Sequence, residues 1–189
     1  YSETEAKWFL LLGAQTNELL GTAIWYVSTN LIEWEYLGEI LSADSEAYMW
    51  ECPDLFELDG QWVFLLSPQG LPAKGHQFQN IYHSVYFPVV RAGSKYEMVN
   101  EKMLEIDWGF EFYAPQTFEA DDGRRILYAW MGVMEPEVEQ ATPTISEGWI
   151  HNLTIPRELQ FENGKLKQYP VPELALLRKN KTTYTLSEP

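Results

Sequence analysis

Three apolar segments with the character of β-strands recur along the chain, and this recurrence limits the folds that the chain can adopt. "WFLLLGAQ" begins at residue 8, "WVFLLSPQG" at residue 62 and "RILYAWMG" at residue 125. Each ends in small or polar residues and is followed by further strand-like segments. Repetition of a unit of several strands at roughly 50 residues indicates a β-propeller. A β-sandwich with irregular spacing fits the same three segments.

The rest of the chain also predicts an all-β protein, because no long segment has the apolar period of a helix. We expect strands at residues 7–15, 21–29, 60–70, 81–90, 124–132, 148–159 and 158–171. The "ENG" of the last segment indicates a hairpin turn, and "EPEVEQATPTI", which contains two prolines, is expected to be a loop. A closed propeller needs roughly four blades or more. The sequence therefore predicts part of a propeller, about three blades.

Composition excludes several kinds of partner. The net charge of −15 would repel a phosphate backbone or an anionic membrane surface, and no apolar run reaches the roughly 18 residues that a membrane span needs. The single cysteine, Cys52, permits no disulfide within the chain and favours a cytoplasmic location over secretion. The aromatic content of 15% suits a β-sheet core, and also suits a surface that stacks on carbohydrate.

The segment "WECPDLF", residues 50–56, places a carboxylate between apolar side chains. Trp50 is positioned to shield Glu51 from water, and burial raises the pKa of a carboxyl group, as a general acid requires. Pro53 stiffens the backbone, and Asp54 is placed to bond its own backbone or a ligand hydroxyl. On these residues alone, a solvated or salt-bridged turn glutamate is the simpler interpretation.

A second segment, "DWGFEFYAPQTF" at residues 107–118, gathers polar side chains among aromatic ones. Strand alternation predicts Phe110 and Phe112 on one face and Glu111 and Tyr113 on the other. A polar pair flanked by rings suits the recognition of hydroxyl groups. Trp130, near the end of the following strand, is placed to stack on the face of a sugar.

Four motifs in this order, "WECPDLF", "DWGFEFYAPQTF", "DDGRRILYAWMG" and "GWIHNLTIPREL", resemble glycoside hydrolase family 32. That family contains invertases, fructan hydrolases and sucrose-6-phosphate hydrolases. The resemblance implies a five-bladed β-propeller followed by a β-sandwich. It predicts a partial β-propeller catalytic domain at residues 1–178 and the start of a linker at residues 179–189, with the C-terminal β-sandwich absent.

The resemblance also implies residue roles in the retaining cleavage of β-fructosides through a covalent fructosyl-enzyme. Glu51 matches the family's general acid/base, and Cys52 and Pro53 match the residues that tune its environment. Glu111 replaces the usual aspartate of a "DFYA" segment, which alters the expected hydroxyl contact. The predicted substrate-binding residues are Trp50, Asp54, Glu111, Tyr113 and Trp130.

Two further family motifs are missing from these 189 residues. The family nucleophile is the aspartate of an "NDPNG"-type motif, and its transition-state stabiliser is the aspartate of an "RDP" motif. Retaining hydrolysis needs two carboxylates about 5 to 5.5 Å apart. We therefore expect the chain alone to be inactive and its parent protein to be a β-fructofuranosidase. The mechanism implies no metal and no cofactor.

Other functions fit the same residues. A non-catalytic carbohydrate-binding module would use the same aromatic and polar side chains, and a structural fragment would pair its open blade edges with another copy. The expected ligand is a small carbohydrate: sucrose, sucrose 6-phosphate or a fructan. Lys74, His76 and His83 are candidates for holding a phosphate, although scattered basic residues are more often plain surface.

Overall fold

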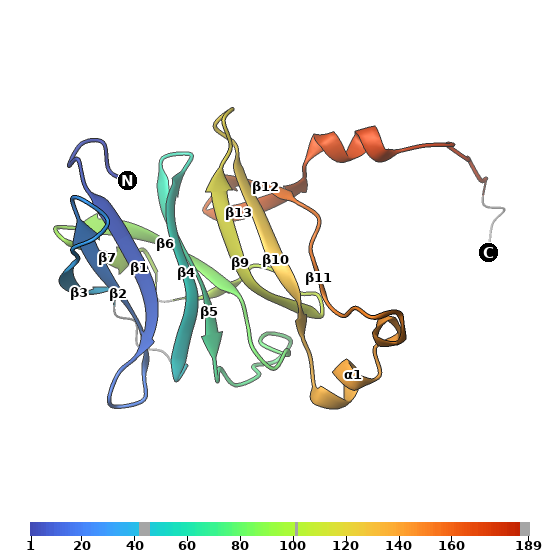
Figure 1. Ribbon diagram of the computed structural model, residues 1–189, viewed down its shortest axis with the longest axis horizontal. Helices are drawn as coiled ribbons and strands as arrows, with labels where there is room; N and C mark the ends of the chain where they lie inside the picture. Colours follow the sequence, from blue (N-terminus) through green and yellow to red (C-terminus); the bar gives the residue numbers. More distant parts are fainter. Residues whose placement is uncertain (42–45, 101, 186–189) are drawn as a thin grey trace.

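A computed structural model describes residues 1–41, 46–100 and 102–185, and it contains three antiparallel sheets that lie side by side (Figure 1). The first sheet consists of β1 (Trp8–Gln15), β2 (Gly21–Ser28) and β3 (Glu35–Leu41). The second consists of β4 (Met49–Leu58), β5 (Gln61–Gln69), β6 (Val85–Ala92) and β7 (Lys95–Met98), with β8 (Leu104–Glu105) paired to β6. The third consists of β9 (Glu111–Glu119), β10 (Arg125–Val133), β11 (Asn152–Leu153), β12 (Arg157–Glu162) and β13 (Lys165–Pro170). The predictions of an all-β fold and of three sheet units are confirmed.

The first strand of each sheet lies next to the first strand of its neighbour, in the order β1, β4, β9 (Figure 1). Two apolar clusters fill the spaces between the sheets. Phe64 and Leu66 of β5 belong to the cluster shared with the first sheet, whereas Val63 and Leu65 belong to the cluster shared with the third. Because successive side chains of a strand point to opposite faces, β5 is buried on both sides, which explains its unbroken apolar run.

The three recurring segments do not occupy equivalent positions in their sheets. "WFLLLGAQ" is β1, the first strand of its sheet, whereas the other two segments form β5 and β10, each the second strand of its sheet. The strand equivalent to them in the first sheet is β2. The three units are real, but the alignment between them predicted from the sequence is wrong, because β1 is as apolar as a second strand.

Other local predictions also need correction. Strands β3, β4, β7 and β8 were not expected from the sequence, and residues 81–84 precede β6 instead of belonging to it. Residues 148–159 hold only the short β11 and the start of β12. The segment predicted as a loop contains two short helical turns, α1 (Pro136–Gln140) and η1 (Pro143–Glu147).

The predicted hairpin is confirmed, since Glu162 pairs with Lys165 across Asn163 and Gly164, both of which have positive φ. Such a turn matches the twist of the strands that it joins. The chain continues after β13 into η2 (Pro172–Leu177). The domain boundary at residue 178 stays a prediction, and the last part of the predicted linker, 186–189, lies outside the described residues. No helix within the described ranges is long and apolar enough to cross a membrane.

Candidate active site

Glu51 lies beside a β-bulge in β4. The strand pairs Glu51 with Ser67 of β5 and then Asp54 with Leu65, so β4 contains one extra residue between these pairs. Cys52, within the bulge, has a φ of 47°. A bulge of this kind bends the strand and redirects the side chains next to it. The "ECPD" segment is therefore an irregular part of a strand, not the turn that the sequence suggested.

The Glu51 carboxylate is held by one of its two oxygens. The Tyr113 hydroxyl donates a hydrogen bond to Oε2 at 2.6 Å, and Nε2 of Gln69 donates to the same oxygen at 2.8 Å. No described residue donates to Oε1. Fixing one oxygen orients the carboxyl group while its other oxygen remains available, which is the arrangement that proton transfer to or from a ligand requires.

Tyr113 provides the shorter of these contacts from β9. It is 5% exposed, and its ring lies 5.9 Å from that of Tyr82. Burial raises the pKa of the Tyr113 phenol far above its usual value, and the bond to Glu51 raises it further. Tyr113 therefore stays protonated and acts as a hydrogen-bond donor.

Asp54 and the bulge join β4 to β9. Oδ2 of Asp54 accepts hydrogen bonds from the backbone nitrogen and the hydroxyl of Thr117, at 2.9 and 2.6 Å, and Nε2 of Gln116 donates to the carbonyl of Cys52. Burial raises the pKa of the Asp54 carboxyl, and the bonds from Thr117 only partly oppose this effect. Asp54 thus ties two sheets together, and its role as a substrate contact stays a prediction.

Trp50 does not face the site. Its side chain is 0% exposed and packs in the cluster between the first two sheets, with its ring 6.4 Å from Phe64. A Cβ added at Gly13 would lie 2.1 Å from the Trp50 carbonyl oxygen, and one at Gly21 would lie 2.2 Å from its indole ring. The predicted substrate contact by Trp50 is therefore wrong: Trp50 is a packing residue beneath Glu51.

The predicted alternation around Glu111 is also wrong. Phe110 precedes β9 and is 87% exposed, whereas Phe112 is buried. Glu111 and Ala114 have positive φ values of 67° and 49°, so β9 departs from regular pleating. Glu111 is half-buried, and its predicted contact with a substrate hydroxyl stays a prediction.

Trp130 lies opposite Tyr113 in the pairing of β9 with β10. Directly paired residues of antiparallel strands project from the same face, so Trp130 is on the side of the sheet from which Tyr113 reaches Glu51. At 36% exposure its ring remains accessible. Tyr113 thus contacts Glu51 directly and is paired with Trp130, and the substrate-binding roles of Tyr113 and Trp130 stay predictions.

Gln69 and Tyr82 also contact the site residues, and neither was predicted from the sequence. Gln69 closes β5, the strand paired with the one that carries Glu51, and Tyr82 forms an isolated bridge with Gln69. The polar ending of "LLSPQ" was a usable signal, since a strand end next to Glu51 places its side chain within reach of that carboxylate.

Two surface cavities lie elsewhere in the molecule. One, of about 290 Å³, is lined by residues that include Val27 and Trp34. The other, of about 450 Å³, is lined by residues that include Asp59 and Arg124. Glu51 lines neither of these two cavities. Among the described residues, no group of three or more His, Cys, Asp and Glu side chains is arranged to hold a metal ion.

Comparison with known proteins extends over nearly the whole chain. Residues 1–170 match the model of the glycosyl hydrolases family 32 N-terminal domain. The chain is 48% identical over 183 residues to a sucrose-6-phosphate hydrolase of Bacillus subtilis (strain 168), covering 94% of this chain and 38% of that protein. It is 40% identical to a sucrose-6-phosphate hydrolase of Klebsiella pneumoniae, covering 92% of this chain and 38% of that protein.

Solved structures are also similar. A GH32 β-fructofuranosidase of Bombyx mori matches with a TM-score of 0.83 and 32% identity, covering 93% of this chain and 37% of that one. A sucrose-6-phosphate hydrolase of Lactobacillus gasseri matches with a TM-score of 0.81 and 32% identity, covering 94% and 37%. The chain thus spans little more than a third of the length of these proteins. The matches and the three sheets confirm a partial β-propeller, and the chain belongs to glycoside hydrolase family 32.

Proposed function

We propose that this chain supplies the general acid/base of a retaining β-fructofuranosidase. The observation that carries the proposal is the Glu51 carboxylate, which Tyr113 and Gln69 hold by Oε2 while no described residue donates to Oε1. The accessible ring of Trp130 lies on the same side. The names of the similar sucrose-6-phosphate hydrolases support this function, as does the Bombyx mori relative, a mutant of which was solved in complex with sucrose.

In the proposed mechanism, the nucleophile is the aspartate of the "NDPNG"-type motif, which is missing from these 189 residues. This aspartate attacks the anomeric carbon of the fructosyl unit. The bond to the leaving glucosyl oxygen breaks, and Glu51 gives that oxygen its proton. Glu51, now a carboxylate, takes a proton from the water that attacks the fructosyl-enzyme and frees fructose. Tyr113 and Gln69 keep the carboxyl group oriented through both steps, and Trp130 contacts the sugar ring.

The test is Glu51→Gln in the full-length protein, with release of fructose from sucrose, sucrose 6-phosphate and inulin as the measurement. Glutamine keeps the shape of the side chain but cannot exchange the proton, so kcat should fall by about 100-fold or more. Glu57→Gln is the matched control, because Glu57 lies exposed on the same strand. Undiminished fructose release by the Glu51 variant would favour a non-catalytic carbohydrate-binding module.

We also expect the 189-residue chain to be inactive by itself. Retaining hydrolysis needs a second carboxylate close to Glu51, and the motif that supplies the family nucleophile is missing. The isolated chain should release no fructose above the level of its Glu51→Gln variant. Release at rates typical of an enzyme would require a nucleophile among the residues present, and would overturn this part of the proposal.

The choice between sucrose and its 6-phosphate rests on two exposed side chains. His83 is buried against Phe78, with Nε2 3.3 Å from the carbonyl of Leu71, so it is not available to a phosphate. Lys74 and His76 are exposed in the segment between β5 and β6, near Tyr82 in the chain. If they bind phosphate, Lys74→Met should lower kcat/KM for sucrose 6-phosphate and leave that for sucrose unchanged, whereas Lys95→Met should change neither.

Two further properties belong to the proposal. Trp8, Leu10 and Leu12 of β1 are each more than a third exposed. This exposed apolar face of an edge strand favours self-association of the isolated chain. Size-exclusion chromatography of the chain tests this expectation. We also propose a cytoplasmic location, which the single cysteine favours over secretion. Fractionation of cells that produce the full-length protein tests it.

A further inference from the structure

We propose that His151, paired with Glu139, is a positioning residue that fixes the Trp130 ring, opposite Tyr113 in the strand pairing, for contact with the sugar. The inference rests on the proposed function for the sugar itself. It assigns a role to Glu139 of α1 and to His151 of the segment before β11, two residues that take no part in the catalytic mechanism.

The first observation concerns the strand that carries Trp130. Met131 pairs with Phe112 and Val133 pairs with Glu111, so Gly132 is an extra residue in β10. A Cβ at Gly132 would lie 2.2 Å from the Trp130 indole. The ring therefore lies across the bulge, close to the backbone, and only glycine leaves room for it there.

The second observation is the contact on the ring itself. The His151 imidazole meets the Trp130 indole edge to face, with 5.0 Å between centroids and 83° between planes. This is a favoured arrangement of two aromatic rings. His151 has a φ of 64°, a conformation that costs free energy for a residue other than glycine. The backbone is thus held in an unfavourable conformation where it presents the imidazole to Trp130.

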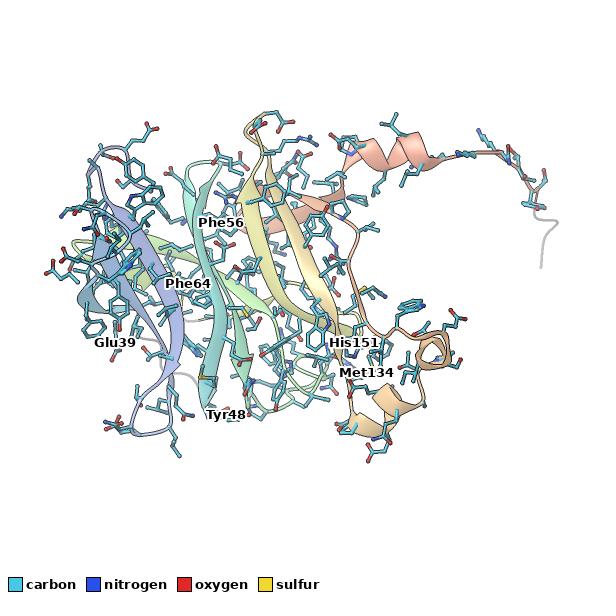
Figure 2. All side chains as sticks on the ribbon, in the orientation of Figure 1. Glu39, Tyr48, Phe56, Phe64, Met134 and His151 are labelled. Atoms are coloured by element: carbon cyan, nitrogen blue, oxygen red, sulfur yellow. The ribbon has the colours of Figure 1, made fainter. Side chains whose placement is uncertain are left out.

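The third observation is the partner of His151. Its Nε2 lies 3.0 Å from Oε1 of Glu139 in α1. Nε2 of His151 is buried. Its distance to Oε1 of Glu139 is that of an ion pair, but the two groups do not form a hydrogen bond. The short helix lies beyond the end of β10 (Figure 1), and His151 lies at that same end of the strand (Figure 2).

Together, the backbone at Gly132 and the imidazole of His151 hold the Trp130 indole in place. Tyr113, paired with Trp130 across the strands, is meanwhile held by its bond to Glu51. A ring that is already fixed loses less side-chain entropy when a ligand binds to it. Loss of His151 should therefore weaken sugar binding much more than it slows proton transfer at Glu51.

The experiment measures kcat and KM of the full-length protein for its better substrate, sucrose or sucrose 6-phosphate. His151→Ala should raise KM about tenfold, the range of an edge-to-face pair of rings, with kcat changed less than about threefold. His151→Phe keeps an aromatic edge on Trp130 and should recover most of the loss. Glu139→Gln should give an intermediate KM, whereas Glu137→Gln, exposed on the same helix, should match the wild type.

An unchanged KM in His151→Ala, or an equal loss in His151→Ala and His151→Phe, would overturn the inference. A fluorescence measurement without sugar separates this result from failure of the proposed function. Acrylamide should quench Trp130 more strongly in His151→Ala than in the wild type, each compared with the same protein carrying Trp130→Phe. If the full-length protein cleaves no fructoside, the proposed function fails and this quenching difference still tests the anchoring of the ring. Equal quenching would overturn it.

Discussion

The first strands of the three sheets differ in regularity. β1 pairs with β2 in an unbroken register from Trp8 to Gln15. β4 contains a bulge after Glu51, and the pairing of β9 with β10 shifts twice. Each of the candidate catalytic contacts comes from the sheets of β4 and β9, where the pleat is interrupted, and none of them comes from β1.

This difference indicates that the bulges create the site. A regular strand sends alternate side chains to two opposite faces, as β1 does with Phe9 and Leu11 against the core and Trp8 and Leu10 exposed. A bulge redirects a side chain along the strand, here toward the neighbouring sheet. Glu51 and Tyr113 meet across two sheets, a contact that strand pairing within one sheet does not provide.

The largest effect is expected at Gly13, where the regular strand β1 lies against the backbone of the bulged strand β4. Gly13→Ala would put a Cβ 2.1 Å from the Trp50 carbonyl oxygen, and backbone atoms cannot yield as a flexible side chain does. The free energy of unfolding should fall by about 3 kcal/mol, the upper range for overpacking, as measured by urea denaturation.

Gly38→Ala is the matched control for Gly13→Ala. Gly38 has a φ of 97° and no atom within 4 Å of an added Cβ, so its substitution introduces backbone strain without a clash. It should cost about 1 kcal/mol. Equal costs at the two positions would mean that β1 shifts freely away from β4 and that the close approach is not required.

A smaller effect is expected from loss of the contact between the two bulged strands. Tyr113→Phe keeps the ring beside Tyr82 and removes the hydroxyl that donates to Glu51. With only Gln69 to orient the carboxyl group, kcat of the full-length protein should fall about tenfold. Tyr96→Phe, in which the ring is similarly buried between Trp25 and Trp62, should leave kcat unchanged. An unchanged kcat in the Tyr113 variant would show that the hydroxyl does not orient Glu51.

The same substitution in a regular and in a bulged strand compares the two directly. Ala14 lies in the unbroken part of β1, and Ala114 has a φ of 49° in the bulge of β9. Ala14→Gly should destabilise the protein by about 0.5 to 1 kcal/mol, because glycine loses more conformational freedom on folding. Ala114→Gly should stabilise it by about 1 kcal/mol, because the left-handed conformation no longer strains a Cβ. Destabilisation of similar size at both positions in urea titrations would contradict the bulge in β9.

These strands also explain how far the sequence could predict the molecule. Apolar segments such as β5 and β10 predicted an all-β fold with three sheet units, because burial on one or both faces leaves a pattern in composition. The conformations of Cys52 and Ala114 left no such pattern, since neither is a residue that favours positive φ. The predicted alternation at Phe110 failed for this reason, because Glu111 also has a positive φ. The predicted substrate contact of Trp50 failed because its ring is buried between the first two sheets. The grouping of Glu51, Tyr113 and Trp130 in one site was predicted from the order of the motifs, not from periodicity.

The smallest expected effect concerns Asp54, which ties the bulge of β4 to Thr117. Burial raises the pKa of its carboxyl group above the ordinary value of 3.8, so the folded protein binds the proton more tightly than the unfolded chain does. The wild type should therefore lose stability relative to Asp54→Asn as the pH rises from below 3.8 through the raised pKa. Asparagine can still accept the bond from the Thr117 backbone. Urea titrations of both proteins between about pH 3 and pH 7 should show this difference grow with pH and level off once the Asp54 carboxyl is ionised in the folded protein.

Asp122→Asn should show the opposite sign and thus controls for a general effect of lost charge. The hydrogen bond and charge of Arg124 lower the pKa of the exposed Asp122 carboxyl. The folded wild type then binds this proton less tightly than the unfolded chain, so its stability relative to the variant should decrease as the pH falls below 3.8. If both variants shifted in the same direction, net charge would explain the result. Opposite shifts would show that the ionised Asp54 carboxylate lowers the stability of the folded protein, although it joins the two strands that form the site.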